Sequence, residues 1–438
     1  MMLGYLLARA GVEVMVLEKH ADFLRDFRGD TIHPSTLEIM HELGLLDEFL
    51  KRPHQELREL AGQIGEDRVV LADFSHLPTR CRFIAFMPQW DFLDFLADEA
   101  KAFPSFSLRM QAEVTDLVED GDNVVGVRAK VPEGTLDVQA DLVVGADGRH
   151  SAVRDLAGLE VEDLGAPMDA LWLRLSKRPE DGSVVLGRIQ AGHLFVMLDR
   201  GDYWQCAFVI PKGGFAELRR RGLPAFREEI VKLNPDLANR VQELKSWDDV
   251  KLLTVRVDRL KRWYRPGVLC IGDAAHAMSP VGGVGINLAI QDAVAAANSL
   301  AVPLKKGPVP VELLAKVQRR REWPTRMMQA VQIFVQTRII SNVLAMQTQP
   351  RAPFAVKLLN QYPWLRRLPA RLIGMGFRPE HVQSPALATT PARHDGRKAE
   401  GDDCDAGKGS GPSGHGGLLW LGTVAKISDI RKSEIRNQ

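Results

Sequence analysis

Cysteine is scarce in this sequence, and no two cysteines are closely spaced. The four cysteines of the 438-residue chain lie far apart, without a Cys-x-x-Cys pair or a metal-ligand spacing. This excludes a disulfide framework or a zinc site of the usual spacing, so no metal site is expected. The N-terminus also lacks a signal-peptide pattern. A reduced, cytoplasmic protein fits these absences best.

An excess of charge and a long apolar run are also missing. Lys and Arg number 57 against 56 Asp and Glu, which gives a net charge of +1. Such a balance gives no case for nucleic acid as a partner. No 18 uncharged apolar residues follow one another; the nearest approach, Met327–Met346, is interrupted by three glutamines, Arg338 and Asn342. We therefore expect no integral membrane association.

Residues 267–293 carry the most informative pattern in the chain. The apolar run Val268–Ile271 ends at Gly272-Asp273, which places a carboxylate at the carboxyl end of a buried strand. A turn and an Ala-rich helix follow, and their characteristic residues are Pro280, Gly282, Gly283, Gly285 and Asn287. Carboxylates accept hydrogen bonds from hydroxyls, helix N-termini favour negative charge, and glycines permit close backbone approach. The pattern predicts a site for an anionic ligand with hydroxyl groups, because an ordinary strand-to-helix turn needs fewer glycines.

The first residues predict the second half of a βαβ unit. Leu3–Ala10 has a helical pattern, and the β-branched run Val12–Leu17 ends at Glu18. In a dinucleotide-binding unit, a first strand and a Gly-rich loop precede such a helix, about 20 residues before the acidic residue. Counting back from Glu18 places that loop upstream of Met1. We therefore expect this chain to lack the first strand and its phosphate loop.

The middle of the chain predicts two sets of antiparallel strands. Residues 112–140 alternate in three runs separated by Asp-Gly and Glu-Gly turns, which is typical of a meander. Leu142–Gly145 follows as a buried strand and ends in Ala146-Asp147-Gly148. Residues 171–210 again alternate with period two, which predicts a separate antiparallel sheet.

That sheet supplies the substrate-binding candidates. Residues two apart share a face, so Trp172 lies beside Arg174, and Trp204 lies on a face with Cys206 and Phe208. Either face could line a flat apolar pocket, and either could simply pack the sheet on helices. Further candidate partners for a phenol or carboxylate are Arg188, His193 and Tyr203.

The remainder of the chain is expected to be helical and then unstructured. Residues 288–303 and 310–375 have helical patterns, with breaks expected at Pro324, Pro350, Pro353 and Pro363. Residues 386–438 are mostly rich in small and polar residues, and we expect a disordered tail there.

Three separated segments together resemble the FAD-dependent aromatic hydroxylases, the single-component flavoprotein monooxygenases with the p-hydroxybenzoate hydroxylase-like fold. The family's Asp-Gly motif with a downstream Ser-x-Val-Arg is matched by residues 145–154. Its Gly-Asp motif, followed by Ala-His, proline, Gly-Gly-x-Gly and Asn, is matched by residues 272–287. The resemblance covers roughly residues 3–385. The family's Gly-x-Gly-x-x-Gly is absent, and Gly4 matches only the small residue one helical turn beyond it.

This resemblance implies FAD as cofactor and assigns roles to the motif residues. Asp273 would bond the ribityl chain, Glu18 the adenosine ribose, and Pro280 would lie against the isoalloxazine ring. The implied cofactor-binding set is Glu18, Arg28, Gln89, Asp147, Gly148, Arg154, Gly272, Asp273, Pro280, Gly282, Gly283, Gly285 and Asn287. Pro280 and His276 are the candidates for catalysis, although His276 could equally pack near the flavin.

The implied fold is α/β, with a three-layer FAD-binding Rossmann-like domain whose first strand is missing. We expect it in two parts, 1–165 and 259–303, around an inserted antiparallel-sheet substrate domain, 166–258, with C-terminal helices at 304–385. The implied reaction uses NAD(P)H and O₂ to hydroxylate a small aromatic substrate through a C4a-hydroperoxyflavin. Two alternatives stay open: a reductase or other oxidoreductase of the same fold, and a truncated chain that binds no FAD and is inactive. A halogenase is disfavoured because its Trp-x-Trp-x-Ile-Pro signature is missing.

Overall fold

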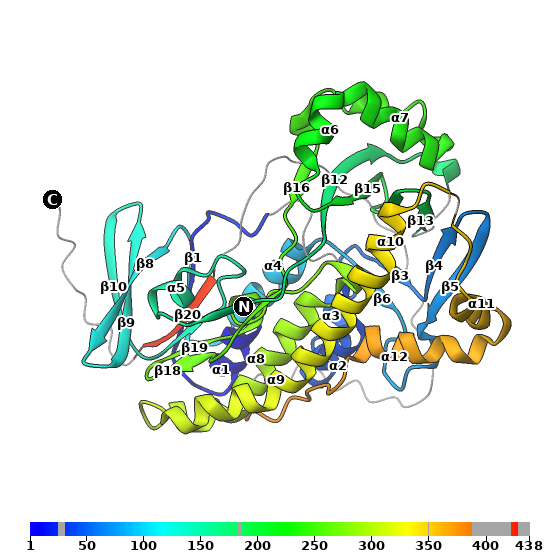
Figure 1. Ribbon diagram of the computed structural model, residues 1–438. Coiled ribbons are helices and arrows are strands. Elements are labelled where there is room, and N and C mark those ends of the chain that lie inside the picture. Colours follow the sequence, from blue (N-terminus) through cyan, green and yellow to red (C-terminus); the bar gives the residue numbers. More distant parts are fainter. Residues whose placement is uncertain (25–30, 182–185, 349, 388–421, 428–438) are drawn as a thin grey trace.

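Two large sheets, one for each set of predicted strands, organise the chain (Figure 1). The computed structural model describes residues 1–24, 31–181, 186–348, 350–387 and 422–427. Arg28, one of the residues assigned to the cofactor, lies outside the described residues.

The first sheet contains the strand ends that carry both aspartate motifs. Its strands, in spatial order, are β18 (Tyr264–Arg265), β19 (Val268–Cys270), β10 (Gly134–Gly145), β20 (Gly422–Ile427), β1 (Val14–Glu18) and β7 (Phe106–Arg109). The pairs β1–β7 and β10–β19 are parallel, as expected for a doubly wound α/β domain. One hydrophobic core joins this sheet to helices α1 (Met2–Arg9), α4 (Gln89–Ala100) and α8 (Gly285–Leu304).

A single long strand connects this sheet to the predicted meander. The first half of β10 pairs with β9 (Asn123–Val131), which pairs in turn with β8 (Glu113–Asp120). The second half of β10 pairs with β19. The meander projects to the left in Figure 1 and contributes its inner side chains to the same core. The separate strand expected at residues 142–145 is therefore the end of β10.

Strand β20 departs from the disordered tail expected over residues 386–438. It lies antiparallel between β1 and β10, with Ala425 opposite Met15 on one side and Val143 on the other. The reason is backbone hydrogen bonding, because the facing edges of β1 and β10 carry rows of N–H and C=O groups that a strand between them satisfies. In a dinucleotide-binding sheet this position belongs to the first strand.

The second sheet is larger than the range expected for it. Its order is β16 (Lys251–Leu253), β12 (Met168–Ser176), β15 (Tyr203–Pro211), β14 (His193–Asp199), β13 (Leu186–Gln190), β4 (Glu59–Ile64) and β5 (Asp67–Asp73). The hairpin β4–β5 precedes the expected boundary at residue 166, and it joins because β4 pairs in parallel with β13. Helices α6 (Phe215–Arg221) and α7 (Leu223–Leu233) cover one face, at the top of Figure 1.

The C-terminal helices pack along α8 and under the second sheet. They are α9 (Val311–Phe334), a π-helical turn (Val335–Ile340), α10 (Ser341–Ala345), α11 (Phe354–Gln361) and α12 (Arg367–Met375). The break expected at Pro324 is wrong, since α9 continues through it. Side-chain bonds from Gln318, Arg321 and Gln329 hold the helix to its neighbours on both sides of the proline. No helix among the described residues has the length and apolar character needed to cross a bilayer.

Short elements complete the molecule. The small strands are β2 (Thr31–Ile32), β3 (Gln55–Leu57), β6 (Ile84–Phe86), β11 (Val161–Asp163) and β17 (Asp258–Leu260), and the remaining α-helices are α2 (Pro34–Glu42), α3 (Leu46–Phe49) and α5 (Ala152–Leu156). Strand β2 pairs with β6, and this pairing brings Thr31 close to the glycine turn after β19.

Candidate functional site

The two aspartate motifs meet at the carboxyl edge of the first sheet. Gly145 at the end of β10 lies opposite Cys270 at the end of β19, so Asp147 and Asp273 follow neighbouring parallel strands. Arg149 reaches across, with Nη2 3.7 Å from Asp273 Oδ2. Glu18 ends β1 at this same edge, since β1 and β10 both run antiparallel to β20. The three acidic positions predicted from sequence therefore share one edge.

The two aspartates have different surroundings. The Asp147 carboxylate accepts hydrogen bonds from the Ser151 hydroxyl and from Val153 N, at 3.1 Å, and so caps α5. Burial raises the pKa of the Asp147 carboxyl, against the lowering effect of these bonds. The Asp273 side chain is 30% exposed, and Arg149 is its one ion-pair partner among the described residues. Asp273 is thus the carboxylate open to ligand hydroxyls, whereas the Asp147 segment can offer the backbone around Gly148, whose φ is +82°.

Arg154 contacts two groups next to this edge of the sheet. Its Nη2 donates to Arg149 O at 3.0 Å, and its Nη1 lies 3.8 Å from the buried carboxylate of Asp258. Burial raises the pKa of Asp258 even though Arg154 acts in the opposite direction. The predicted Arg154 therefore holds the Arg149 loop in place rather than lying open to a ligand.

The glycine turn has a backbone that needs glycine. Gly272, Gly282 and Gly283 have φ values of +59°, +79° and +63°. A Cβ on Gly283 would lie 2.5 Å from Thr31 Oγ1, which donates to Gly283 O at 2.9 Å. Asn287 is buried and fully engaged, because its Oδ1 accepts from His33 N (3.0 Å) and Thr36 Oγ1 (2.7 Å). Asn287 thus anchors the turn to the segment after β2.

Helix α9 holds the proline end of the turn through buried glutamines. Gln332 accepts from Ser279 N at 3.1 Å and donates to Ser279 O and Val281 O at 3.0 and 2.9 Å, which brackets Pro280. Gln329 donates to Asp258 O and Ala277 O at 2.8 and 3.2 Å. Sequence reasoning missed these residues. The signal available in the sequence was that these glutamines interrupt an apolar helical run, because a glutamine buried on such a helix needs hydrogen-bond partners.

A buried charge network fixes the Gly-Asp corner. Asp292 accepts from Gly272 N (3.0 Å), His276 Nε2 (2.5 Å) and Arg321 Nε (2.9 Å). Burial alone would raise the pKa of Asp292, but His276 and Arg321 outweigh it and hold that pKa below its ordinary value. Arg321 also lies 3.3 Å from Glu380, which Arg320 binds at 2.6 Å.

This network changes the interpretation of His276. The ring is buried between Asp292 and Trp263, whose ring centroid lies 4.9 Å away. Such a histidine orients its neighbours, which favours the packing role over the catalytic one. Sequence reasoning missed Asp292 and Arg321, because a charged residue in an Ala-rich or Arg-rich helix usually faces solvent.

Gln89, one of the residues assigned to the cofactor, begins α4, half-buried and directly after Pro88. It follows β6, which pairs with β2 at Thr31, the residue that binds the glycine turn. Gln89 therefore approaches the site from the β2–β6 side.

The second sheet separates the six substrate candidates onto opposite faces. One face packs on α6 and α7, and it carries Trp204 with its neighbours Cys206 and Phe208. Arg188 and His193 belong to this covered face, since Arg188 lies opposite Phe195 and the His193 ring is 5.6 Å from Phe208.

The other face turns toward the glycine turn. Val209 and Met168 on this face form one cluster with Val281 of the turn and with Ile340. Trp172, Arg174 and Tyr203 share the face by strand register, and the Arg174 guanidinium lies 3.7 Å from the Tyr203 ring centre. Only these three candidates lie on the side of the predicted flavin site.

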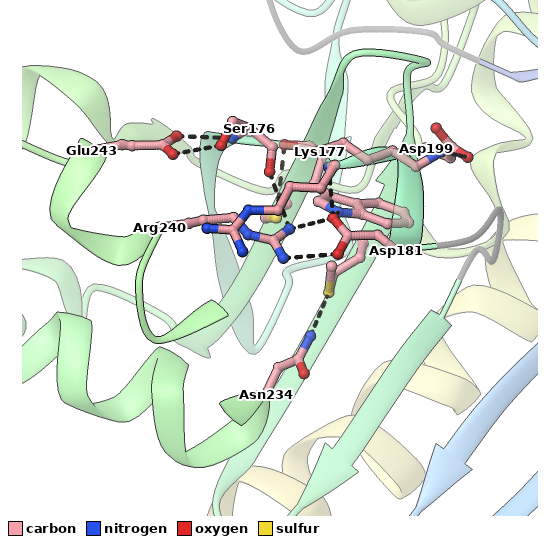
Figure 2. Close-up of polar contacts among 11 residues, drawn as sticks. Ser176, Lys177, Asp181, Asp199, Asn234, Arg240 and Glu243 are labelled. Carbon is pink, nitrogen blue, oxygen red and sulfur yellow. Dashed lines mark hydrogen bonds and ion pairs between the residues drawn. The ribbon is translucent and has the colours of Figure 1, made fainter. Parts of the chain in front are cut away.

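Figure 2 shows a second polar cluster, on strands and loops of the second sheet. Lys177 lies 2.6 Å from Asp199, and Arg240 forms two bonds to Asp181. The bonds from Arg240 lower the pKa of Asp181 to about 2. Because each of these two carboxylates has a cationic partner, the cluster ties the helical segment after α7 to the sheet.

The residues at the sheet edge fit FAD. An open carboxylate beside a turn of positive-φ glycines, and an acidic residue at the end of β1, are what a ribityl chain, a flavin ring and an adenosine ribose require. The first turn of α8 adds a helix N-terminus at the same turn.

Comparison with known proteins agrees. The FAD binding domain family matches residues 1–331. The 6-methylpretetramide 4-monooxygenase of Streptomyces rimosus is 32% identical over 87% of this chain and 91% of its own length. A 12-dehydrotetracycline 5-monooxygenase/anhydrotetracycline 6-monooxygenase of the same species is 29% identical over 73% of this chain, which spans 64% of that relative.

Solved structures show the same fold. The p-nitrophenol 4-monooxygenase PnpA of Pseudomonas putida DLL-E4 superposes with a TM-score of 0.68 at 20% identity, over 86% of this chain and 95% of that one. The probable FAD-dependent monooxygenase pqsL of Pseudomonas aeruginosa gives a TM-score of 0.66 at 23% identity, over 78% and 94%. Together with the motif geometry, these matches make the chain a member of the FAD-dependent aromatic hydroxylase family, with FAD as its cofactor and an oxidoreductase function.

Proposed function

We propose that this protein is an NAD(P)H-dependent monooxygenase that inserts one atom of O₂ into a phenolic aromatic substrate. One observation carries the proposal: the face of the second sheet that α6 and α7 do not cover, here called the open face, contacts Val281 of the glycine turn at one end. A flat substrate on that face would lie against the turn that the family places beside the flavin. The covered face, with Trp204, Arg188 and His193, is not part of this proposed pocket.

Bound FAD would supply the electron transfer from the nicotinamide and the reaction with O₂. The chain's own residues hold and orient it. Asp273 would accept hydrogen bonds from the ribityl hydroxyls, and Glu18 from those of the adenosine ribose. The backbone at Gly148, Gly282 and Gly283 would allow close approach to the ring system. The N-terminus of α8 would stabilise negative charge at the edge of the ring that lies against it.

A buried amide on the π-helical turn supports a substrate site beside this face, because Val335 and Ile340 of the same turn belong to the cluster with Val209 and Val281. Gln336 lies in the π-helical turn, one helical turn beyond Gln332, and its Nε2 has no hydrogen-bond partner among the described residues. Such a group is costly unless a ligand satisfies it, and π-helical turns are frequent at functional sites. We assign Gln336 as donor to a substrate oxygen, with Trp172 and Tyr203 as aromatic walls.

The similarity to 6-methylpretetramide 4-monooxygenase makes polycyclic phenols the first substrates to test. The experiment incubates FAD-loaded protein with NADH or NADPH, ¹⁸O₂ and either 6-methylpretetramide or a single-ring phenol. We expect one ¹⁸O atom in the product and nicotinamide oxidation matched to product. Nicotinamide oxidation that yields only hydrogen peroxide with every phenol would contradict the proposal. Product with two hydrogens added and no ¹⁸O would instead identify a reductase.

A further inference from the structure

The C-terminal helices expose many large apolar side chains. Eight of the thirteen large hydrophobic side chains exposed among the described residues lie between Trp323 and Leu368. Scattered exposed apolar groups are ordinary, but a concentration in one region marks a contact surface.

The clearest part of this region is the helical hairpin formed by α11 and by residues 363–375. Its inner side is packed, with Val356 against Ile64 and Val69, and Ala370 against Phe74 and Leu77. Its outer side is open. We call the hairpin surface the exposed set Phe354, Lys357, Tyr362, Trp364, Arg367, Leu368 and Arg371. Phe354, Trp364 and Leu368 are 77%, 62% and 66% exposed.

The charge along this segment of the sequence has one sign. Residues 323–379 contain no Asp or Glu and eight Arg or Lys. Lys357, Arg367 and Arg371 form no ion pair with any described residue. Their charge is therefore not neutralised within the described fold, in contrast to the paired charges of Figure 2.

We propose that the hairpin surface docks on an anionic lipid membrane, with its helices lying in the interface. Aromatic side chains such as Trp364 and Tyr362 favour the headgroup level of a bilayer, and Phe354 and Leu368 would enter the acyl boundary. The adjacent arginines would bind lipid phosphates while their stems cover apolar surface.

Other occupants fit less well. A second copy of this chain, packed through the same surface around a twofold axis, would bring Arg367 and Arg371 close to their own equivalents. Nucleic acid would satisfy the arginines but leave Phe354 and Leu368 without apolar contacts, since such interfaces are polar. An anionic bilayer provides both negative charge and an apolar layer.

The test is co-sedimentation of the full, FAD-loaded protein with phosphatidylcholine vesicles that contain or lack phosphatidylglycerol. We expect binding only to the anionic vesicles, weakened by salt. The variant Arg367→Gln/Leu368→Gln/Arg371→Gln should lose it, at roughly fivefold for each arginine with a further loss from the leucine. The matched control is Val302→Gln/Lys305→Gln/Lys306→Gln, which removes one exposed apolar and two exposed basic residues at the end of α8.

Unchanged thermal midpoints and flavin absorption in both variants would show that each has folded. Equal weakening by the control variant would overturn the proposal, because general positive charge would then explain binding. A dimer that the hairpin variant dissociates, without vesicle binding by the parent, would also overturn it in favour of self-association. These outcomes do not depend on the monooxygenase activity proposed above.

Discussion

The glycine turn at residues 272–287 and the second sheet contribute to one proposed pocket in opposite ways. Around the turn, most polar groups are bonded within the chain: Asn287 to the segment after β2, Asp292 to Gly272 and His276, and Gln332 to the backbone beside Pro280. On the other sheet face, strand register places Trp172 and Tyr203, which are half-buried, and the Arg174 guanidinium lies against the Tyr203 ring. Several hydrogen bonds fix the backbone of the turn at once, whereas the side chains on the sheet face can be exchanged with less effect on the backbone. We therefore expect substitutions of buried residues around the turn to change how the cofactor is held, and substitutions on the sheet face to change which substrate is accepted.

The largest effect is expected from Asp292→Ala, which tests whether the buried network defines the turn. Removing this carboxylate leaves Gly272 N, His276 Nε2 and Arg321 Nε without their acceptor, and breaking a buried ion pair costs about 3–5 kcal/mol. Urea unfolding should show that loss. Glu322→Ala is the matched control on α9, because Glu322 makes an ion pair with the exposed Arg326 and a long bond, at 3.5 Å, from Gln318, and its loss should cost no more than about 1 kcal/mol. A similar loss of unfolding free energy in the two variants would mean that the buried network contributes no more to stability than an exposed ion pair.

Two tryptophans sharpen the contrast between the sheet faces. Trp204→Ala should cost about 3 kcal/mol or more of stability, since its buried indole packs under α6 and α7 and donates to Asp181 at 3.3 Å. Trp172→Ala should cost less stability and should raise the KM for the aromatic substrate. Unfolding curves and steady-state kinetics on both variants separate the two effects. An unchanged KM in Trp172→Ala would remove that face from the pocket.

Asp273→Asn should weaken FAD binding without destabilising the apoprotein, because this carboxylate is partly exposed and, among the described residues, makes one long ionic contact, at 3.7 Å. A hydrogen bond to a charged group contributes about 1.5–3 kcal/mol, so the dissociation constant should rise roughly 10- to 100-fold. Flavin fluorescence titration measures this change. Asp122→Asn, at an exposed turn position between β8 and β9, should leave the affinity unaltered. Equal affinities in the two variants would contradict the assignment of Asp273.

The smallest expected effect is a pH dependence of stability that originates in the second sheet. The pKa of Asp181 in the folded protein is about 2, against an ordinary value of 3.8, because Arg240 bonds to it. A lowered pKa contributes stability above pH 4, and this contribution is lost as the pH falls from about 4 toward 2. Asp181→Asn should abolish that part of the acid transition in denaturation followed by circular dichroism. An identical acid limb in the variant would exclude Asp181 as its origin.

Local motifs predicted the strand and turn at residues 268–287 more accurately than alternation predicted the second sheet. The strand end, the aspartate and the glycine turn at residues 268–287 are dictated by neighbouring residues, so their sequence order was sufficient. The face to which Trp204 belongs depends on α6 and α7, which cover it from elsewhere in the chain. Pairing of β4 with β13 and insertion of β20 between β1 and β10 likewise depend on contacts between distant segments. Period-two patterns identify faces but not what covers them.

Partners distant in sequence explain the remaining differences. Asp292 lies in a helix whose pattern only indicates packing, and its role depends on Arg321, 29 residues away. Pro324 was expected to break its helix, yet neighbouring side chains anchor α9 on both sides of it. Arg28, predicted to reach the cofactor, stays a prediction.

Glu380 has a practical consequence for anyone who would exchange parts of this enzyme with a relative. It is bound by Arg320 and Arg321, and Arg321 reaches Asp292 behind the Gly-Asp corner. The helical hairpin therefore cannot be grafted as an independent module that stops at Met375. A chimaera whose crossover separates residue 380 from residues 320–321 should leave Glu380 and Arg320 without their ion-pair partners and Arg321 with Asp292 as its remaining one, and we expect the resulting defect in coenzyme binding as well as at the crossover.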